Sequence, residues 1–167
     1  MTETRRVPLD AMHRAAGAKM GPFAGWEMPI QYPAGLKAEH QHTREAASLF
    51  DVSHMGQLRV TATDGRASTL HAQLEAALPV DFEGWASGQQ KYSYLLNDAG
   101  GIEDDLMLVH LTDGRHAEVR IVVNAGNRDA DLQWFHRHCP KLRFEWVPAA
   151  LLALQGPGAE QALAALD

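Results

Sequence analysis

The sequence predicts an α+β fold with a mainly antiparallel sheet and helices packed on it. Three observations predict this fold class. Short strand-like segments are joined by glycine-containing turns, which favours hairpins. Helical patterns occur among the strands, and the regular strand–helix–strand repetition of a parallel sheet is absent. Hydrophobic residues make up 46% of the 167 residues, so the chain can bury a core suited to one domain of ordinary size.

The first part of the chain combines an irregular start with one helix. Glycine and proline recur through residues 1–35 and interrupt any long element. Residues 26–32 are nevertheless apolar and partly extended, as in a segment that packs over the main fold. Residues 36–49 have apolar positions at helical spacing, with charged residues on the opposite side, so we expect a helix there.

The next segments predict a strand, a helix and a hairpin. Residues 57–61 alternate polar and apolar, which is typical of a half-buried strand. A helix follows to about Ala77, and Asp64 is placed to cap it by accepting a first-turn N–H. Residues 92–96 and 102–111 are two further strands, and the glycine-containing turn between them predicts a hairpin.

The rest of the chain continues the same mixture. The pair Asp113-Gly114 predicts a second hairpin turn into a strand at 118–123, so three consecutive strands form a meander. A helix capped by Asn127 or a neighbour extends to His138, and two strands are expected at 143–147 and 151–154. Gly156-Pro157 opens a last helix, because proline fits the first helical position. The apolar residues of this helix are expected to face inward: Ala159, Ala162, Leu163 and Leu166.

Composition argues against several classes of function. The net charge is −6 and basic residues are not clustered, which disfavours nucleic-acid binding. The apolar runs are too short to cross a bilayer, and the first six residues lead into no secretory signal. The single cysteine, Cys139, allows no intrachain disulfide and favours a reducing, cytoplasmic setting, where it acts as a small apolar residue. His40 and His42 point apart on a helix, so no metal site is expected there.

Two adjacent carboxylates are the most informative feature. Asp104 and Asp105 follow a glycine turn and begin an apolar strand. Neighbouring strand residues point to opposite faces, so one of the two carboxylates shares a face with apolar side chains. A carboxylate in such surroundings is either paired or used in chemistry. It could satisfy N–H groups of the turn or sheet, or it could act as an acid, base or electrostatic partner.

Two other segments allow a structural and a functional interpretation. In residues 50–56, Asp51 or Ser53 could cap free backbone groups, with His54 packed and Met55 filling the core; loops of this kind also carry function. In residues 122–129, the asparagines could cap a helix or bind a planar polar ligand. The residues alone favour the structural interpretation in both segments.

Five segments, taken together and in order, resemble the glycine cleavage system T-protein family, the aminomethyltransferases. They are residues 17–29, 50–56, 92–106, 122–127 and 154–157. The resemblance implies a folate-binding domain of α+β type, with residues 1–167 as its N-terminal part and later domains outside this chain. Family members continue well beyond this chain, which stops at Asp167 within a helical pattern, so the resemblance implies a truncated chain that is inactive alone.

The resemblance also implies a reaction, its partners and its residues. An aminomethyl group on the lipoyl arm of the H-protein is transferred to tetrahydrofolate, with release of ammonia. The second aspartate of the family's Gly-Gly-x-x-Asp-Asp motif corresponds to Asp105, which would be the catalytic residue. Met55, Tyr92, Asp105 and Asn124 would bind the folate. No metal, nucleic acid or membrane is implied.

Two alternatives share this fold. One is a folate-dependent demethylase, and the other is a non-enzymatic, folate-binding factor for iron–sulfur cluster maintenance. The complete Gly-Gly-x-x-Asp-Asp motif favours the transferase over the maintenance factor. Glu103 departs from the family pattern, in which an apolar residue is more usual at this position, and this bears on local burial rather than on Asp105.

Overall fold

The computed structural model describes residues 4–112 and 117–166. The chain divides into two compact units. One is Met55–Pro148, and the other joins Met1–His54 to Ala149–Asp167. The sequence pattern predicted no such division, because no linker-like composition marks the two crossings.

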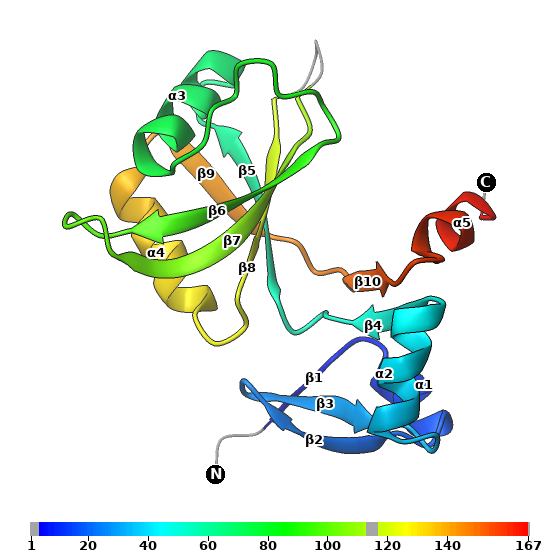
Figure 1. Cartoon of the computed structure of the whole chain (residues 1–167). Helices are drawn as coiled ribbons and strands as arrows, with labels where there is room; N and C mark the ends of the chain where they lie inside the picture. The colour runs from blue at the N-terminus through cyan, green and yellow to red at the C-terminus, as the bar shows by residue number, and fades with distance from the viewer. Residues whose placement is uncertain (1–3, 113–116, 167) are drawn as a thin grey trace. The chain divides into compact units, whose positions relative to one another are not determined.

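The Met55–Pro148 unit contains a five-stranded sheet in the order β6-β7-β8-β5-β9 (Figure 1). Each neighbouring pair is antiparallel, which confirms the predicted fold class and the meander of three strands. The predicted turn at Asp113-Gly114 lies outside the described residues. The elements are β5 (Gly56–Ala62), α3 (Ala67–Ala77), β6 (Gln90–Leu96), β7 (Ile102–His110), β8 (Val119–Val123), α4 (Arg128–His138) and β9 (Leu142–Trp146).

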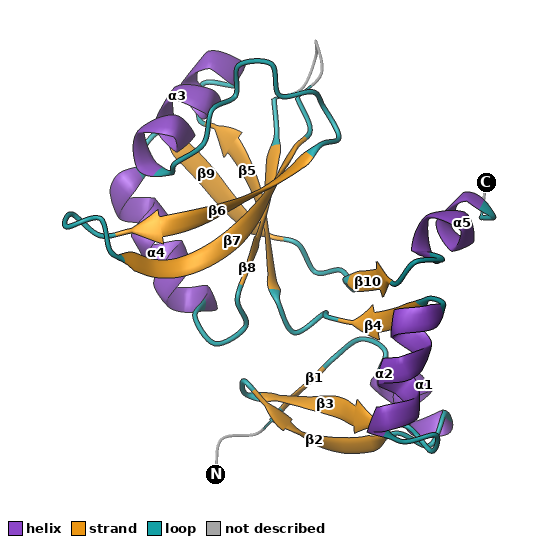
Figure 2. Cartoon of the chain, in the orientation of Figure 1, coloured by secondary structure: helices purple, strands orange, loops and turns teal. Residues whose placement is uncertain are grey.

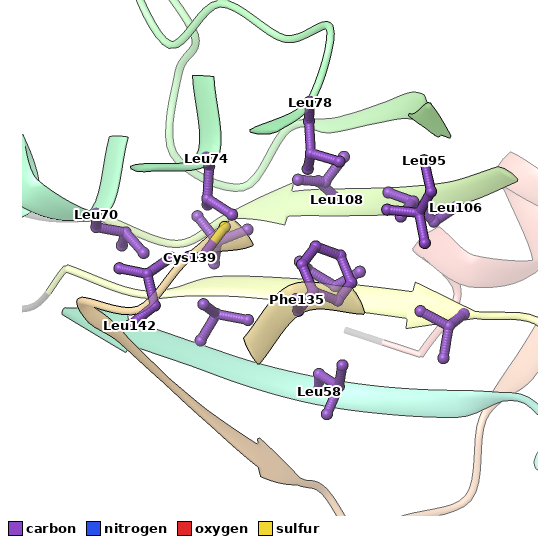
Figure 3. Close-up of a cluster of buried hydrophobic side chains, with 14 of the residues drawn as sticks. Leu58, Leu70, Leu74, Leu78, Leu95, Leu106, Leu108, Phe135, Cys139 and Leu142 are labelled. Atoms are coloured by element: carbon purple, nitrogen blue, oxygen red, sulfur yellow. The ribbon is translucent and has the colours of Figure 1, made fainter. Parts of the chain in front are cut away.

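One face of this sheet is covered by the two helices and holds the core. Alternate residues of β7, such as Leu106 and Leu108, are buried against leucines of α3 and Phe135 of α4. Cys139 lies among the same side chains, at the end of α4 (Figure 3). It is buried, as the sequence predicted. The intervening residues of β6 and β7 point to the opposite face, where Tyr92 is 57% exposed.

The hairpin between β6 and β7 is built by one asparagine and two glycines. Oδ1 of Asn97 accepts N–H groups from Ala99 at 3.1 Å and from Gly101 at 2.8 Å. Gly100 has a φ of 79°, a conformation that favours glycine. Leu95 pairs with Asp104 and Leu96 with Ile102, so Glu103 is an unpaired bulge residue. Because Glu103 is exposed, its charge is accommodated in water.

The helix α3 begins close to the predicted point. Oδ1 of Asp64 accepts the Arg66 N–H at 3.0 Å, and its Oδ2 accepts the Thr69 hydroxyl at 2.8 Å. Asp64 therefore stabilises the start of α3, although Arg66 occupies the N-cap position. Leu70 and Leu74, one turn apart, are fully buried on the sheet.

The second unit contains two small sheets, ordered β1-β3-β2 and β10-β4 (Figure 2). Its elements are β1 (Arg5–Arg6), α1 (Asp10–Ala15), β2 (Lys19–Phe23), β3 (Trp26–Gln31), α2 (Leu36–Glu45), β4 (Ser48–Asp51), β10 (Leu152–Gln155) and α5 (Ala159–Ala164). The expectation of an irregular start was wrong, since α1 and a β2–β3 hairpin lie there. Ala24 and Gly25 form its two-residue loop, both with positive φ.

Two further expectations for this unit were wrong. The helix predicted over residues 36–49 ends at Glu45, because residues 48–51 pair with β10 as β4. The apolar side of α5 does not face inward among the described residues, where Leu163 is 61% exposed. Pro157 precedes the N-cap residue Gly158 rather than starting the helix.

A buried hydrogen-bonded group ties this unit together. The His13 ring lies 2.7 Å from the Tyr32 hydroxyl and 2.8 Å from Oδ2 of Asp51. Oδ1 of Asp51 accepts the Ser53 N–H at 2.9 Å. Burial opposes ionisation of Asp51, but the hydrogen bonds from Ser53 and His13 outweigh it and lower its pKa. The structural interpretation of Asp51 and Ser53 is therefore confirmed.

Within the described residues, no helix has the length and apolar character needed to cross a membrane. The same residues contain no cluster of three histidine, cysteine or acidic side chains arranged to hold a metal ion.

Candidate functional site

The strand register aligns the predicted site residues at one end of the larger sheet. Asp105 pairs with Tyr94 across β6 and β7. Leu106 and Gly56 both pair with Val123, one from each side. Asp105, Asn124 and Met55 each lie one residue beyond these pairs, so they follow one another across β7, β8 and β5. Residues directly opposite on neighbouring strands share a face, which is here the face away from α3 and α4.

Asp105 is half-buried, and side chains from two different elements bind its carboxylate. The Tyr92 hydroxyl donates a hydrogen bond to Oδ2. Nδ2 of Asn124 donates to Oδ1 at 3.1 Å. Because each oxygen has its own donor, the carboxylate is held in one orientation while retaining lone pairs for a ligand.

Tyr92 remains a hydrogen-bond donor at neutral pH. Its hydrogen bond to Asp105, with further contributions from burial and nearby charge, raises the pKa of the phenol to about 12. Tyr92 packs edge-on against Tyr94, with ring centroids 5.6 Å apart. The two rings form an exposed aromatic edge beside the carboxylate.

Asp104 points to the opposite face and is held differently. Its Oδ1 accepts the Asp105 N–H at 2.9 Å and Nδ2 of Asn124 at 2.8 Å, and its Oδ2 accepts Nδ2 of Asn127 at 3.0 Å. Burial raises the pKa of Asp104, but the hydrogen bonds from both asparagines outweigh it, so the pKa is lowered overall. Asp104 therefore fits the structural interpretation, in which a carboxylate satisfies nearby polar groups. Asp105 instead lies on the face away from α3 and α4, which we call the open face.

The asparagines bind carboxylates instead of capping the helix. Asn127 occupies the N-cap position of α4, yet its side chain makes no capping hydrogen bond and binds Asp104. Asn124 connects both aspartates, since its Nδ2 lies within hydrogen-bond distance of each side chain. The prediction that these side chains cap the helix was wrong. Pairing of β7 with β8 brings the asparagines close to carboxylates that lie far from them in the sequence.

Met55 is half-buried and immediately precedes β5. It lies beside Asn124 in the register and has no polar group that could join the hydrogen bonds around Asp105. Gly56 follows it, and a Cβ added there would lie 2.7 Å from side-chain atoms of both Trp146 and Val123.

Asp131, which the sequence did not single out, completes the group. It lies in the first turn of α4, is only 4% exposed, and is within hydrogen-bond range of Asp104. Burial and then the charges of Asp104 and Asp105 raise its pKa to about 7. A signal was present in the sequence, because Asp131 shares a helix face with the apolar residues Trp134 and Phe135.

This arrangement suits a flat ligand that carries an amine. Aromatic edges can contact a planar ring, and an oriented carboxylate can accept an amine hydrogen or stabilise a developing positive charge.

Comparison with known proteins gives a consistent result. The profile of the family described as GCVT N-terminal domain matches residues 9–167. The chain is similar to an aminomethyltransferase of Cutibacterium acnes, with 42% identity over 100% of this chain and 44% of that protein. It is also similar to a mitochondrial aminomethyltransferase of Dictyostelium discoideum, with 37% identity over 96% of this chain and 40% of that protein.

A solved structure agrees in fold as well as in sequence. The crystal structure of glycine cleavage system aminomethyltransferase T from Bartonella henselae matches with a TM-score of 0.87 and 41% identity. The match covers 98% of this chain and 44% of that one. The chain thus spans less than half the length of these relatives, and with its profile match over residues 9–167 it belongs to the GCVT N-terminal domain family.

Proposed function

We propose that the protein containing this chain is an aminomethyltransferase of the glycine cleavage system. The aminomethyl group on the lipoyl arm of an H-protein reacts with tetrahydrofolate. The carbon forms bonds to two folate nitrogens and loses its bonds to sulfur and to the amine. The two folate N–H protons balance the products, which are ammonia, a free lipoyl thiol and methylenetetrahydrofolate. A cytoplasmic location belongs to the same proposal.

The observation that carries this proposal is the orientation of Asp105 on the open face of the sheet. Tyr92 and Asn124 each bind one carboxylate oxygen. The carbon passes through a cationic, iminium-like species, and a fixed negative charge beside it lowers the barrier. The same carboxylate can orient a folate N–H so that the nitrogen lone pair faces the carbon. Asp105 is thus the proposed catalytic residue.

The remaining predicted residues form the folate-binding surface in this proposal. Tyr92 and its neighbour Tyr94 offer ring edges to the pterin, Asn124 fixes Asp105, and Met55 supplies an apolar, adaptable contact at the end of the row. Residues 1–167 would then be the N-terminal part of a folate-binding domain that the rest of the protein completes.

Asp105→Asn tests the proposal in the protein as its gene encodes it. The variant keeps the shape of the side chain and removes its charge, so we expect the rate of transfer from aminomethylated H-protein to fall by about 10²- to 10³-fold. Asp98→Asn is the matched control, since Asp98 is exposed in the hairpin that precedes β7. An Asp105→Asn protein as fast as this control would exclude the proposed role. Wild-type protein that binds tetrahydrofolate but transfers no carbon would exclude the proposed reaction.

A further inference from the structure

Asp131 is a buried acid that the proposed reaction does not use directly. It belongs to the first turn of α4 and lies on the core side of the sheet, whereas Asp105 faces the other side. Its Oδ2 is buried and has no hydrogen-bond partner among the described residues. Buried polar oxygens without partners are uncommon in folded proteins.

A proton on Asp131 would let this carboxyl group form a hydrogen bond. A protonated carboxyl group is a donor, and Asp104, within hydrogen-bond range, is an acceptor. Asp104 already accepts N–H groups from Asp105, Asn124 and Asn127 and is the member of the pair whose ionised form is stabilised. A buried and a half-buried carboxylate within hydrogen-bond range hold one proton between them more favourably than none.

The charges around Asp131 come from a small number of groups. From β7, Asp104 and Asp105 act on it and oppose its ionisation. The loop between β8 and α4 contributes the neutral amides of Asn124 and Asn127. On α4, Asp129 is exposed, and Arg128 holds its guanidinium over the Trp146 ring at 4.6 Å. The N-terminal turn of α4 favours a negative charge, but burial and the two carboxylates outweigh it.

These contacts connect Asp131 to Asp105 through two intermediates. Asp104 lies within hydrogen-bond range of Asp131 and binds Nδ2 of Asn124 at 2.8 Å. The same nitrogen lies 3.1 Å from Oδ1 of Asp105. If Asp131 lost its proton, Asp104 would face a like charge and lose a donor, and the position of Asn124 would change with it.

We propose that Asp131 is a positioning residue: by keeping a proton it holds Asp104, and through Asn124 it fixes the orientation of the Asp105 carboxylate. The inference rests on the proposed function for what the positioned Asp105 does, but not for the positioning itself. Ionisation of Asp131 weakens the hold of Asn124 on Oδ1 of Asp105 and leaves the carboxylate bound by Tyr92 alone, so the site is competent when Asp131 is protonated and loses competence as the pH rises.

Three variants of the whole gene product separate the possibilities. Asp131→Asn keeps a donor that cannot ionise, and Asp131→Ala removes the donor. Asp129→Asn makes the same change two residues away at an exposed position and serves as control. Carboxyl signals of ¹³C-aspartate-labelled protein, assigned by single Asp→Asn replacements, are followed against pH in the absence of substrate.

We expect the Asp131 carboxyl to titrate near pH 7 and the Asp105 signal to change with it. That coupled change should be absent in Asp131→Asn, and the Asp105 signal should be displaced at every pH in Asp131→Ala. The transfer rate should decline above about pH 7 in the wild type and in Asp129→Asn. In Asp131→Asn this decline should disappear.

An Asp131 carboxyl that titrates at an ordinary pKa, or an Asp105 signal indifferent to both Asp131 variants, would overturn the inference. A decline of the rate with pH that persists unchanged in Asp131→Asn would also overturn it. If wild-type protein transfers no carbon at any pH, the proposed reaction fails, and the carboxyl signals alone decide the role of Asp131.

Discussion

Asp104→Ala tests whether hydrogen bonds to Asp104 stabilise the site, because this carboxylate accepts hydrogen bonds from several elements. In the wild type, Asp104 accepts hydrogen bonds from Asn124 at 2.8 Å and from Asn127 at 3.0 Å. It also accepts the Asp105 N–H at 2.9 Å. The variant removes the carboxylate that Asn127 binds and leaves Asn124 only its bonds to Asp105.

The expected loss of stability follows from these contacts. Hydrogen bonds to a charged acceptor contribute about 1.5–3 kcal/mol each. Asp104 is half-buried, so water can replace part of what is lost, and the lower figure applies to the two asparagine bonds. Removing Asp104 also removes the cost of burying its charge, which offsets part of the loss. We therefore expect the free energy of unfolding of the Met55–Pro148 unit to fall by about 2–3 kcal/mol.

Urea unfolding followed by tryptophan fluorescence measures this loss. Trp85, Trp134 and Trp146, three of the four tryptophans, belong to this unit. Glu103→Ala is the matched control: it removes an exposed acid at the adjacent bulge position and should change stability by less than about 0.5 kcal/mol. If Asp104→Ala destabilises no more than Glu103→Ala, the hydrogen bonds do not hold the site.

The difference in stability between wild type and Asp104→Ala should depend on pH. The folded-state pKa of Asp104 lies below its ordinary value of 3.8, so its stabilising contribution is complete above that value. The contribution is lost as the pH falls through the folded-state pKa. The difference in stability between wild type and Asp104→Ala should therefore shrink in acid. A difference that grows as the pH falls below about 4 would contradict this sign.

Gly56 and Cys139 give two further, independent tests. A Cβ added at Gly56 would lie 2.7 Å from Val123 Cγ2 and 2.7 Å from Trp146 Cζ3, so Gly56→Ala should destabilise the unit by about 1–3 kcal/mol in urea unfolding. Gly126→Ala, where nothing lies within 4 Å, should be nearly neutral, and equal effects would refute the packing argument. Burial raises the pKa of Cys139 to about 11, so about one thiol in a thousand is ionised at pH 8 and alkylation should require unfolding. Rapid alkylation of the folded chain would contradict that burial.

Much of the larger unit could be predicted because its signals are local. The alternation of β5, the glycine turn before β7 and the leucine spacing of α3 each lie within a few residues. The expectations that failed depended on partners far along the chain. Ala46, Ala47 and Leu49 continue the helical spacing of the preceding residues, but residues 48–51 pair with β10 about a hundred residues later. Proline and glycine in the first 35 residues predicted an irregular segment, but a hairpin forms there. Its two-residue loop has positive φ at both Ala24 and Gly25.

The sequence by itself determined the antiparallel α+β class, the hairpin that presents the two aspartates, and the family. Only the tertiary structure decided which aspartate lies on the open face, because a one-residue bulge at Glu103 fixes the register that pairs Asp105 with Tyr94. Only the tertiary structure brought Asp131 beside Asp104, since burial and the proximity of charge depend on how α4 packs on the sheet. Local pattern specifies elements, whereas the pKa of an acid depends on neighbours that the chain order does not reveal.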